Sequence, residues 1–168
     1  MGRRDSEFRE FFEAEFPRLY RLAFLLTHNA DEAEDLAQEA MVRTYRAWDR
    51  IREGEYPLAY ARAVLVNHRR SLARRAKIAA AHPRDPSEPV AEFEGDRLSL
   101  WQSLLALPKA QRDAIVLRYY EDLTEAESAA IMRCPVGTVK SHLRRGLSRL
   151  RVGLADDAGS SSESREPV

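Results

Sequence analysis

The sequence is poor in the residues on which enzymes and metal sites depend. Cysteine occurs once, at Cys134, so no internal disulfide can form, which suits a reducing cytoplasm. No glycine-rich phosphate loop and no nucleophile motif is present. The histidines are scattered and lack metal-ligand spacing with the cysteine: they are His28, His68, His82 and His142. We therefore predict a protein that is not an enzyme and that binds no metal and no cofactor.

Long apolar runs are also missing. No segment approaches the roughly 18 apolar residues that a membrane-spanning helix needs. The opening stretch "MGRRDSEFREFFEAEF" begins with basic residues, but acids and aromatics follow where a signal peptide would have its apolar stretch. These features predict a soluble, cytoplasmic protein without membrane insertion.

Charge is balanced over the whole chain, with 27 basic and 27 acidic residues, but it is sorted along the sequence. Residues 62–77 contain six basic residues and no acid, and residues 134–151 contain five basic residues and no acid. Two basic clusters are thus separated by an acidic segment. The net charges by segment are +2 for 1–77, −4 for 78–96, +5 for 97–153 and −3 for 154–168.

Apolar residues recur at helical spacings of three and four, and no convincing alternating strand is found. Pro17 is expected to kink the first helix or to start a second one, and Asp31 with Glu34 reads as a capping box. The fold class is therefore predicted to be all-α, with two small helical domains joined by a flexible, acidic, proline-containing linker. The expected parts are a domain at 4–79, the linker at 80–96, a second domain at 97–153 and a disordered tail at 154–168.

The second domain has the pattern of a helix-turn-helix. Thr124 and Glu127 form a capping-box signature, and "RCPVG" then interrupts the helix. In the next helix the apolar face and the basic face lie opposite each other. The apolar face holds Val136, Val139, Leu143, Leu147 and Leu150, and the other face holds Lys140, Ser141, Arg144, Arg145 and Ser148. DNA reading fits this arrangement, although cations on a C-terminal helix also suit the helix dipole.

These stretches resemble a bacterial RNA polymerase sigma factor of the extracytoplasmic-function (ECF) group of the sigma-70 family. The resemblance spans about residues 5–153 and rests on "ADEAEDLAQEAMVRTYRAWDRI", "YARAVLVNHRRSLARR" and "LPKAQRDAIVLRYYEDLTEAESAAIMRCPVGTVKSHLRRGLSRLR". It implies that the first domain binds the clamp of the polymerase largest subunit and reads the −10 promoter element. The second domain would bind the flap of the other large subunit and read the −35 element as duplex, while the polymerase supplies the chemistry.

The resemblance also assigns roles to particular residues. Core polymerase would be bound by Asp35, Gln38 and Glu39. Asn67 would hold a flipped −10 base, followed by backbone contacts from His68, Arg69, Arg70, Arg74 and Arg75. The −35 face would comprise Lys140, Ser141, His142, Arg144 and Arg145. The segment "RIREGEYPLAY" resembles the −10 specificity loop, whereas Trp48 and Trp101 are expected in the core.

Two positions depart from the family pattern. Ser128 replaces a branched apolar residue, so it either loosens the packing between the motif helices or faces a backbone carbonyl. His142 stands where arginine is commoner, so the preferred −35 sequence could differ. The alternatives to a sigma factor are a stand-alone helix-turn-helix regulator, which leaves 31–75 without a role, and a helical adaptor for an acidic partner. Anti-sigma proteins are common in the group, and such a partner could hold two tethered domains closed.

Overall fold

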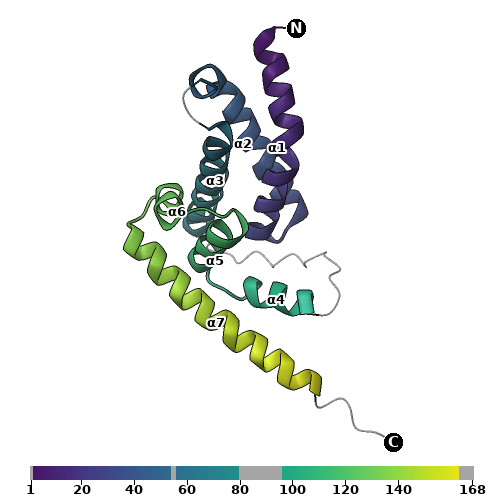
Figure 1. Ribbon diagram of the computed structural model, residues 1–168, viewed down its shortest axis with the longest axis vertical. Coiled ribbons are helices and arrows are strands. Elements are labelled where there is room, and N and C mark those ends of the chain that lie inside the picture. Colours follow the sequence, from purple (N-terminus) through teal and green to yellow (C-terminus); the bar gives the residue numbers. More distant parts are fainter. Residues whose placement is uncertain (1, 54–55, 80–95, 163–168) are drawn as a thin grey trace, which may run out of the picture. The chain divides into compact units, whose positions relative to one another are not determined.

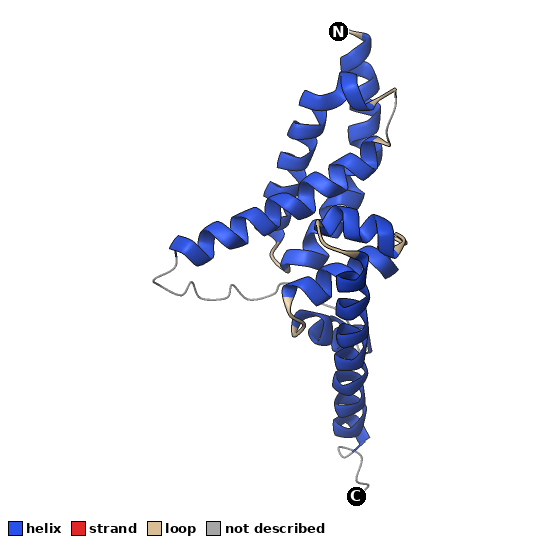
Figure 2. Cartoon of the chain, turned by 90° about the vertical axis from the view of Figure 1, so that its left-hand side faces the viewer, coloured by secondary structure: helices blue, strands red, loops and turns tan. Residues whose placement is uncertain are grey.

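The computed structural model describes residues 2–53, 56–79 and 96–162, and every regular element in these ranges is a helix (Figures 1 and 2). The predicted all-α fold is confirmed. The chain divides into two compact units, Met1–Val90 and Ala91–Val168. Most of the predicted linker lies outside the described residues, and α4 begins at Asp96, the last residue assigned to it.

The first unit consists of three long helices, α1 (Arg3–Thr27), α2 (Ala30–Ile51) and α3 (Pro57–Ala79). Helix α2 packs against both α1 and α3 (Figure 1). Its heptad-like apolar positions supply much of the core, because they repeat at the spacing of one helix face. The most deeply buried apolar side chains of this unit are Leu19, Leu22, Leu26, Leu36, Met41, Ile51, Leu65 and Val66. Trp48 is buried beside Phe8 and Phe11 of α1, as predicted for a core residue.

Two expectations for these helices are narrowed or corrected by the structure. Of the two alternatives for Pro17, a second helix is excluded, because α1 continues through this residue as one helix. Pro17 and Glu13, whose carbonyl would otherwise accept the missing backbone hydrogen bond, are both exposed, so water can satisfy that carbonyl. Asp31 does not cap α2: the cap is Asn29, whose side chain accepts a hydrogen bond from the Glu32 N–H at 2.9 Å. Asparagine is as good a cap as aspartate, and the earlier cap leaves Asp31 in the first turn, where its charge suits the helix dipole.

The second unit is built around one long helix. Helix α7 (Val136–Ser162) packs against α4 (Asp96–Leu105), α5 (Lys109–Ile115) and α6 (Glu125–Met132). A π-helical turn, η1 (Val116–Tyr120), extends α5. The break between α4 and α5 falls at Pro108, as the sequence predicted. The buried core of this unit includes Trp101, Leu107, Ile115, Leu117, Ile131, Met132, Val139, Leu143 and Leu150.

The predicted disordered tail is wrong for its first part. Helix α7 continues to Ser162, beyond the boundary expected at residue 154, and residues 163–168 lie outside the described chain. Adding a residue to an existing helix costs little, because the unfavourable nucleation step has already occurred. No proline lies between Pro135 and Pro167, and the polar residues after 154 do not by themselves end the helix.

Ser128 lies at the centre of the second unit and is fully buried. Its hydroxyl has no hydrogen-bond partner among the residues that the structure describes, so the expectation that it faces a backbone carbonyl is wrong. A buried hydroxyl without a partner costs free energy, and a serine also fills less volume than a branched apolar side chain. The two motif helices therefore pack less favourably than they would with a branched apolar residue at position 128.

Gly146 marks the closest approach between α7 and α5. A Cβ atom at this position would lie 2.6 Å from Ile115 Cδ1, whereas a Cβ at Gly137 would meet no atom within 4 Å. We expect Gly146→Ala to destabilise the second unit by about 1–3 kcal/mol, because Ile115 must leave its rotamer in a packed core. Gly137→Ala, the matched control, should be neutral or stabilising by up to about 1 kcal/mol, since it only improves helix propensity. Urea denaturation measures both, and equal effects would contradict the assigned contact.

Candidate nucleic-acid interface

The predicted helix-turn-helix is present in the second unit. Helix α6 opens on the predicted capping box: the Thr124 hydroxyl accepts from the Glu127 N–H at 3.2 Å, and Glu127 Oε2 accepts from the Thr124 N–H at 2.7 Å. The helix ends at Arg133, whose positive φ of 52° turns the chain. Pro135 then lies directly before α7, where its carbonyl accepts from the N–H groups of Thr138 and Val139 at 2.9 and 3.3 Å. A three-residue turn thus joins the two helices.

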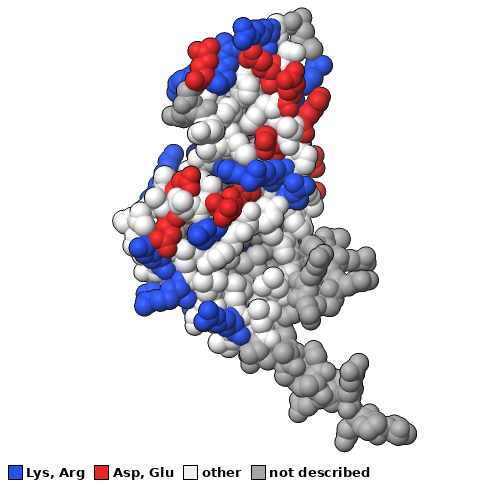
Figure 3. Space-filling view, viewed as in Figure 1, with Lys and Arg blue, Asp and Glu red and all other residues white. Residues whose placement is uncertain are grey.

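The two faces of α7 are separated as the sequence predicted. Val139, Leu143 and Leu150 are buried against the rest of the unit. Of the predicted −35 residues, Lys140, Arg144 and Arg145 are exposed, and Ser141 and His142 are half-buried. Basic side chains follow the helix on the face drawn in Figure 3.

Most of this basic face carries uncompensated charge. Lys140 Nζ lies 3.6 Å from Glu125 Oε2. Because this ion pair is exposed, it is weak and leaves Lys140 able to bind another anion. Arg144 and Arg145 have no carboxylate within ion-pair distance in the described part of the chain. No acidic residue occurs between Cys134 and Arg151. This surface can therefore take up phosphate groups without first breaking internal ion pairs.

The predicted −10 residues lie on α3, and they differ in accessibility. Asn67 is half-buried, and its Nδ2 donates to the Ala63 carbonyl at 2.7 Å. Arg70 is half-buried, and Arg74 and Arg75 are exposed. Arg69 does not share this surface: it is 4% exposed, and its Nη1 donates to the Leu26 carbonyl at 3.2 Å. Its geometry is that of a residue that caps the end of α1, so it does not fit the predicted contact with DNA.

His68 takes part in a contact between α3 and α2. Arg43 Nη2 lies 3.1 Å from His68 Nδ1, and Arg43 Nε lies 2.6 Å from Glu39 Oε1. Burial and the charge of Arg43 lower the pKa of His68 below its ordinary value of 6.5. The hydrogen bond from Arg43 also lowers the pKa of Glu39. One guanidinium thus connects a residue predicted to bind polymerase with a residue predicted to lie near DNA.

The lowered pKa of His68 predicts a pH dependence of stability. Below pH 6.5 the unfolded chain binds a proton at this histidine more readily than the folded chain, so stability falls as the pH drops from 6.5 through the folded pKa. We expect the first unit to be less stable at pH 5.5 than at pH 7.5 in urea denaturation. His68→Gln keeps an acceptor for Arg43 but cannot titrate, so the loss should shrink in this variant. The acidic groups with lowered pKa values, such as Glu39, titrate at lower pH and do not share this window. An unchanged pH profile in His68→Gln would contradict the assignment.

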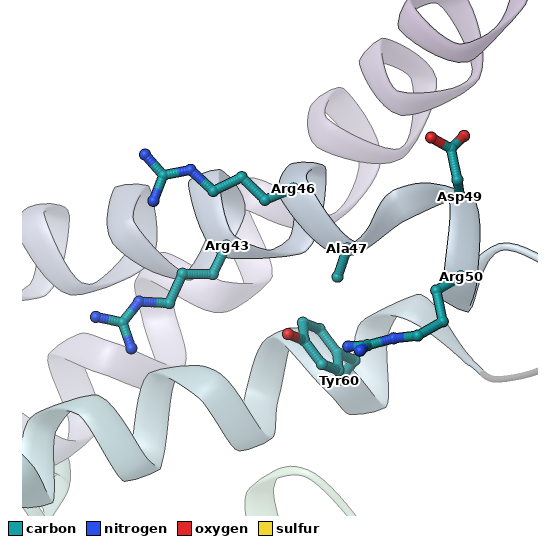
Figure 4. A pocket seen from close by; sticks show the side chains of 6 residues that line it. All are labelled: Arg43, Arg46, Ala47, Asp49, Arg50 and Tyr60. Atoms are coloured by element: carbon teal, nitrogen blue, oxygen red, sulfur yellow. The ribbon is translucent and has the colours of Figure 1, made fainter.

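An open groove between α2 and α3 was not anticipated from the sequence. It has a volume of about 410 Å³ and is lined by Arg43, Arg46, Ala47, Asp49, Arg50 and Tyr60. The three arginines extend from α2 and Tyr60 from α3, while Asp49 points away from the opening (Figure 4). Within the described residues, Arg46 and Arg50 have no ion-pair partner. The positions of the arginines, three and then four residues apart, are the signal that could have placed them on one helix face.

The predicted polymerase-binding residues lie further toward the start of α2. Asp35 and Gln38 are exposed and Glu39 is half-buried, with Gln38 Nε2 donating to Glu34 Oε1 at 3.0 Å. Val42, one turn after Gln38, is an exposed apolar side chain that the sequence reasoning did not single out. An apolar side chain surrounded by acidic and amide groups is typical of a protein-binding surface.

Among the described residues, no three histidine, cysteine, aspartate or glutamate side chains group closely enough to hold a metal ion. No helix in the same part of the chain is long and apolar enough to cross a membrane.

Comparisons with solved structures show similar folds. The sigma factor RpoE from Bartonella quintana, in complex with the anti-sigma factor NepR, has a TM-score of 0.72 and 26% identity, and the alignment covers 89% of this chain and 97% of that chain. CnrH, in complex with the cytosolic domain of CnrY, has a TM-score of 0.66 at 20% identity, covering 91% and 90% of the two chains. The second of these similarities concerns the fold alone.

Sequence comparisons identify the family. The profile described as Sigma-70 region 2 matches residues 11–78, and that described as Sigma-70, region 4 matches residues 97–150. The RNA polymerase sigma-E factor of Streptomyces coelicolor is 36% identical over 152 residues, which cover 88% of this chain and 86% of that protein. The ECF RNA polymerase sigma factor SigW of Bacillus subtilis is 32% identical over 161 residues, covering 83% and 84%. With a basic helix-turn-helix in the region 4 match and a three-helix unit in the region 2 match, the chain belongs to the ECF group of the sigma-70 family, whose members direct promoter-specific transcription initiation by RNA polymerase.

Proposed function

We propose that the two units divide promoter recognition between them, with residues 4–79 reading the −10 element and residues 97–153 reading the −35 element. The observation that carries this proposal is the face of α7, on which Arg144 and Arg145 are exposed without a carboxylate partner in the described chain. A stand-alone helix-turn-helix regulator would use the same face but gives the first unit no task.

The second unit presents α7 to the major groove of the −35 duplex. Arginine and lysine donate to guanine O6 and N7, and serine and histidine make smaller contacts with base edges. The buried residues on the opposite side of α7 anchor it to α5 and α6, so its reading face is held rigidly. The residues in this role are Lys140, Ser141, His142, Arg144 and Arg145.

The first unit binds the opened −10 strand. Asn67 holds a flipped base through its amide, and His68, Arg70, Arg74 and Arg75 lie along the same helix for backbone contacts. The groove with Arg46, Arg50 and Tyr60 extends this surface, since cations and an aromatic ring suit single-stranded nucleic acid. Arg69 is not included, because its guanidinium is buried.

Polymerase supplies the chemistry, so the chain itself is no enzyme and acts in the cytoplasm, where its polymerase is. Asp35, Gln38 and Glu39 bind the clamp of the largest subunit, and the second unit binds the flap of the other large subunit. An anti-sigma partner is supported by one similar structure, since RpoE was solved with the anti-sigma factor NepR. No metal and no cofactor is required for this function.

Transcription from a pooled promoter library tests the proposal. Core polymerase is incubated with and without the protein, and the transcripts are sequenced. Start sites that appear only with the protein, preceded by shared −10 and −35 sequences, are the expected result. If the protein binds operator DNA at near-physiological salt without polymerase and yields no new start sites, the regulator alternative holds instead.

Polymerase binding should depend on the predicted patch of α2. Gln38→Ala combined with Glu39→Ala removes an amide and a carboxylate, and we expect core affinity to fall roughly tenfold or more, as at the centre of a protein interface. Because Glu39 also bonds Arg43 at 2.6 Å, Arg43→Gln is the matched control that frees Glu39 but keeps its carboxylate. Competition against a labelled sigma factor for core polymerase measures both, and normal holoenzyme formation by the double variant would refute the assignment.

A further inference from the structure

The first turns of α1 are tied to the last turns of α2 by a set of polar contacts. Tyr45 is the centre: its hydroxyl donates to Asp5 Oδ1 at 2.7 Å, and the Arg4 guanidinium lies 4.6 Å from its ring centroid. Arg4 Nη2 also donates to the Tyr45 carbonyl at 2.9 Å. These contacts join residues about forty positions apart in the sequence.

Two ion pairs extend the same network toward the end of α2. Arg4 Nη1 lies 3.4 Å from Asp49 Oδ2, and Glu7 Oε2 lies 2.9 Å from Arg52 Nη1. Arg52 is the residue that ends α2, and its N–H donates to the Trp48 carbonyl. The bond from Tyr45 lowers the pKa of Asp5, and the bonds from Arg3 and Arg52 lower the pKa of Glu7, which keeps both carboxylates charged at neutral pH. Arg4, Asp5 and Glu7 all precede residue 11, where the match to the family profile begins.

The contacts and the groove lie on adjoining sides of α2. Tyr45, Asp49 and Arg52 contact α1, whereas Arg46 and Arg50 line the groove toward α3, which Asp49 borders as well. At 100° per residue the centres of the two sets lie roughly 110° apart around the helix. The contacts that hold the last two turns of α2 therefore also determine the positions of Arg46 and Arg50.

The solvent exposure of these side chains argues against a purely structural role for the ion pairs. The side chains of Glu7 and Arg52 are 33% and 28% exposed, and those of Arg4 and Asp49 are 39% and 60% exposed. Exposed ion pairs contribute little to global stability. Trp48 and Ile51 already anchor the apolar side of the last turns of α2 in the core, so the ion pairs act on the orientation of the polar side. Weak contacts at this end of α2 control local orientation far more than they control unfolding of the unit.

We propose that Arg4, Asp5 and Glu7 are positioning residues for promoter opening, because they hold the end of α2 so that Arg46 and Arg50 meet the phosphates of the −10 strand. The inference rests on the proposed function of the first unit. It adds a task for the first two turns of α1, which the family match does not cover.

The test compares two triple variants in the holoenzyme. The first, Arg4→Gln, Asp5→Asn and Glu7→Gln, removes the network. The control, Glu10→Gln, Glu13→Gln and Arg21→Gln, changes exposed residues of the same helix and alters net charge by the same amount. Binding to a forked DNA with a single-stranded −10 segment, affinity for core polymerase and thermal unfolding are measured for each.

We expect the network variant to bind the forked DNA roughly threefold to tenfold more weakly, with core affinity and thermal midpoint close to those of the control. Equal forked-DNA affinity in the two variants would overturn the proposal. A parallel loss of core affinity and thermal stability would also overturn it, because the network would then only hold the fold together. If the unaltered holoenzyme fails to bind the forked DNA, the proposed −10 function is what fails.

Discussion

Replacing Arg144 and Arg145 together with alanine should lower the affinity of the holoenzyme for −35 promoter DNA at least about 30-fold, since each arginine contact is worth about 1 kcal/mol or more. Both side chains are exposed on the face of α7 opposite its buried residues, so their loss leaves the packing of the unit intact. Quantitative footprinting of the −35 element measures the effect, and competition for core polymerase should show no change.

The matched control is Arg149→Ala with Arg151→Ala, which removes the same charge from the same helix. Both residues are exposed, but they lie one to two turns beyond the proposed reading face, and Arg149 is 3.4 Å from Gln111 within its own unit. This variant should weaken all DNA binding modestly through lost phosphate attraction. Equal losses of −35 selectivity in the two variants would mean that α7 acts only as a basic surface.

Arg112→Met should lower the free energy of unfolding of the second unit by about 3 kcal/mol, because hydrogen bonds from a charged group are worth about 1.5–3 kcal/mol each and do not add fully. Arg112 is 8% exposed, and its guanidinium donates to the Leu104 and Leu107 carbonyls at 3.2 Å and also to the Leu105 carbonyl. The Leu104 and Leu105 carbonyls end α4 and the Leu107 carbonyl lies in the turn that follows. Methionine keeps roughly the length of the side chain while removing every donor.

Urea denaturation measures this loss, with Trp101 fluorescence as the signal of the second unit in a Trp48→Phe background. Lys109→Met is the control, because it removes a cation from an exposed position of the same helix and should change stability by less than about 0.5 kcal/mol. Arg112→Lys should fall between the two, since one ammonium cannot reach three carbonyls. An Arg112→Met protein as stable as the control would show that water serves these carbonyls equally well.

Features that depend on short-range chemistry could be predicted from the sequence. The capping box of Thr124 and Glu127, the break at Pro108 and the alternation of buried and basic positions on α7 all follow from side chains within one or two turns of each other. The basic face of α7 could therefore be predicted, because helical spacing alone decides which residues share it.

Features that depend on competition between alternatives or on contacts between distant residues could not be predicted from the sequence. Asn29 and Asp31 are both good caps, and only the fold decides between them. Arg69 has the same sequence surroundings as the more accessible Arg70, but it is buried and donates to the Leu26 carbonyl near the end of α1. The groove beside Tyr60 requires the packing of α2 against α3, which the periodicity of either helix cannot predict. The π-helical turn at Val116–Tyr120 has no local signature in the sequence.

The guanidinium of Arg43 has a consequence for engineering. A chimera in which α3 is exchanged for that of another sigma factor would be designed to change the promoter while keeping the polymerase. Here the exchange also removes His68, one of the two partners of Arg43, and leaves Glu39 on the retained helix with an altered neighbour. Residues 39, 43 and 68 should therefore be exchanged together. In a graft that transfers α3 without a compatible residue at 43, we expect the change in promoter choice to be coupled to a change in polymerase affinity.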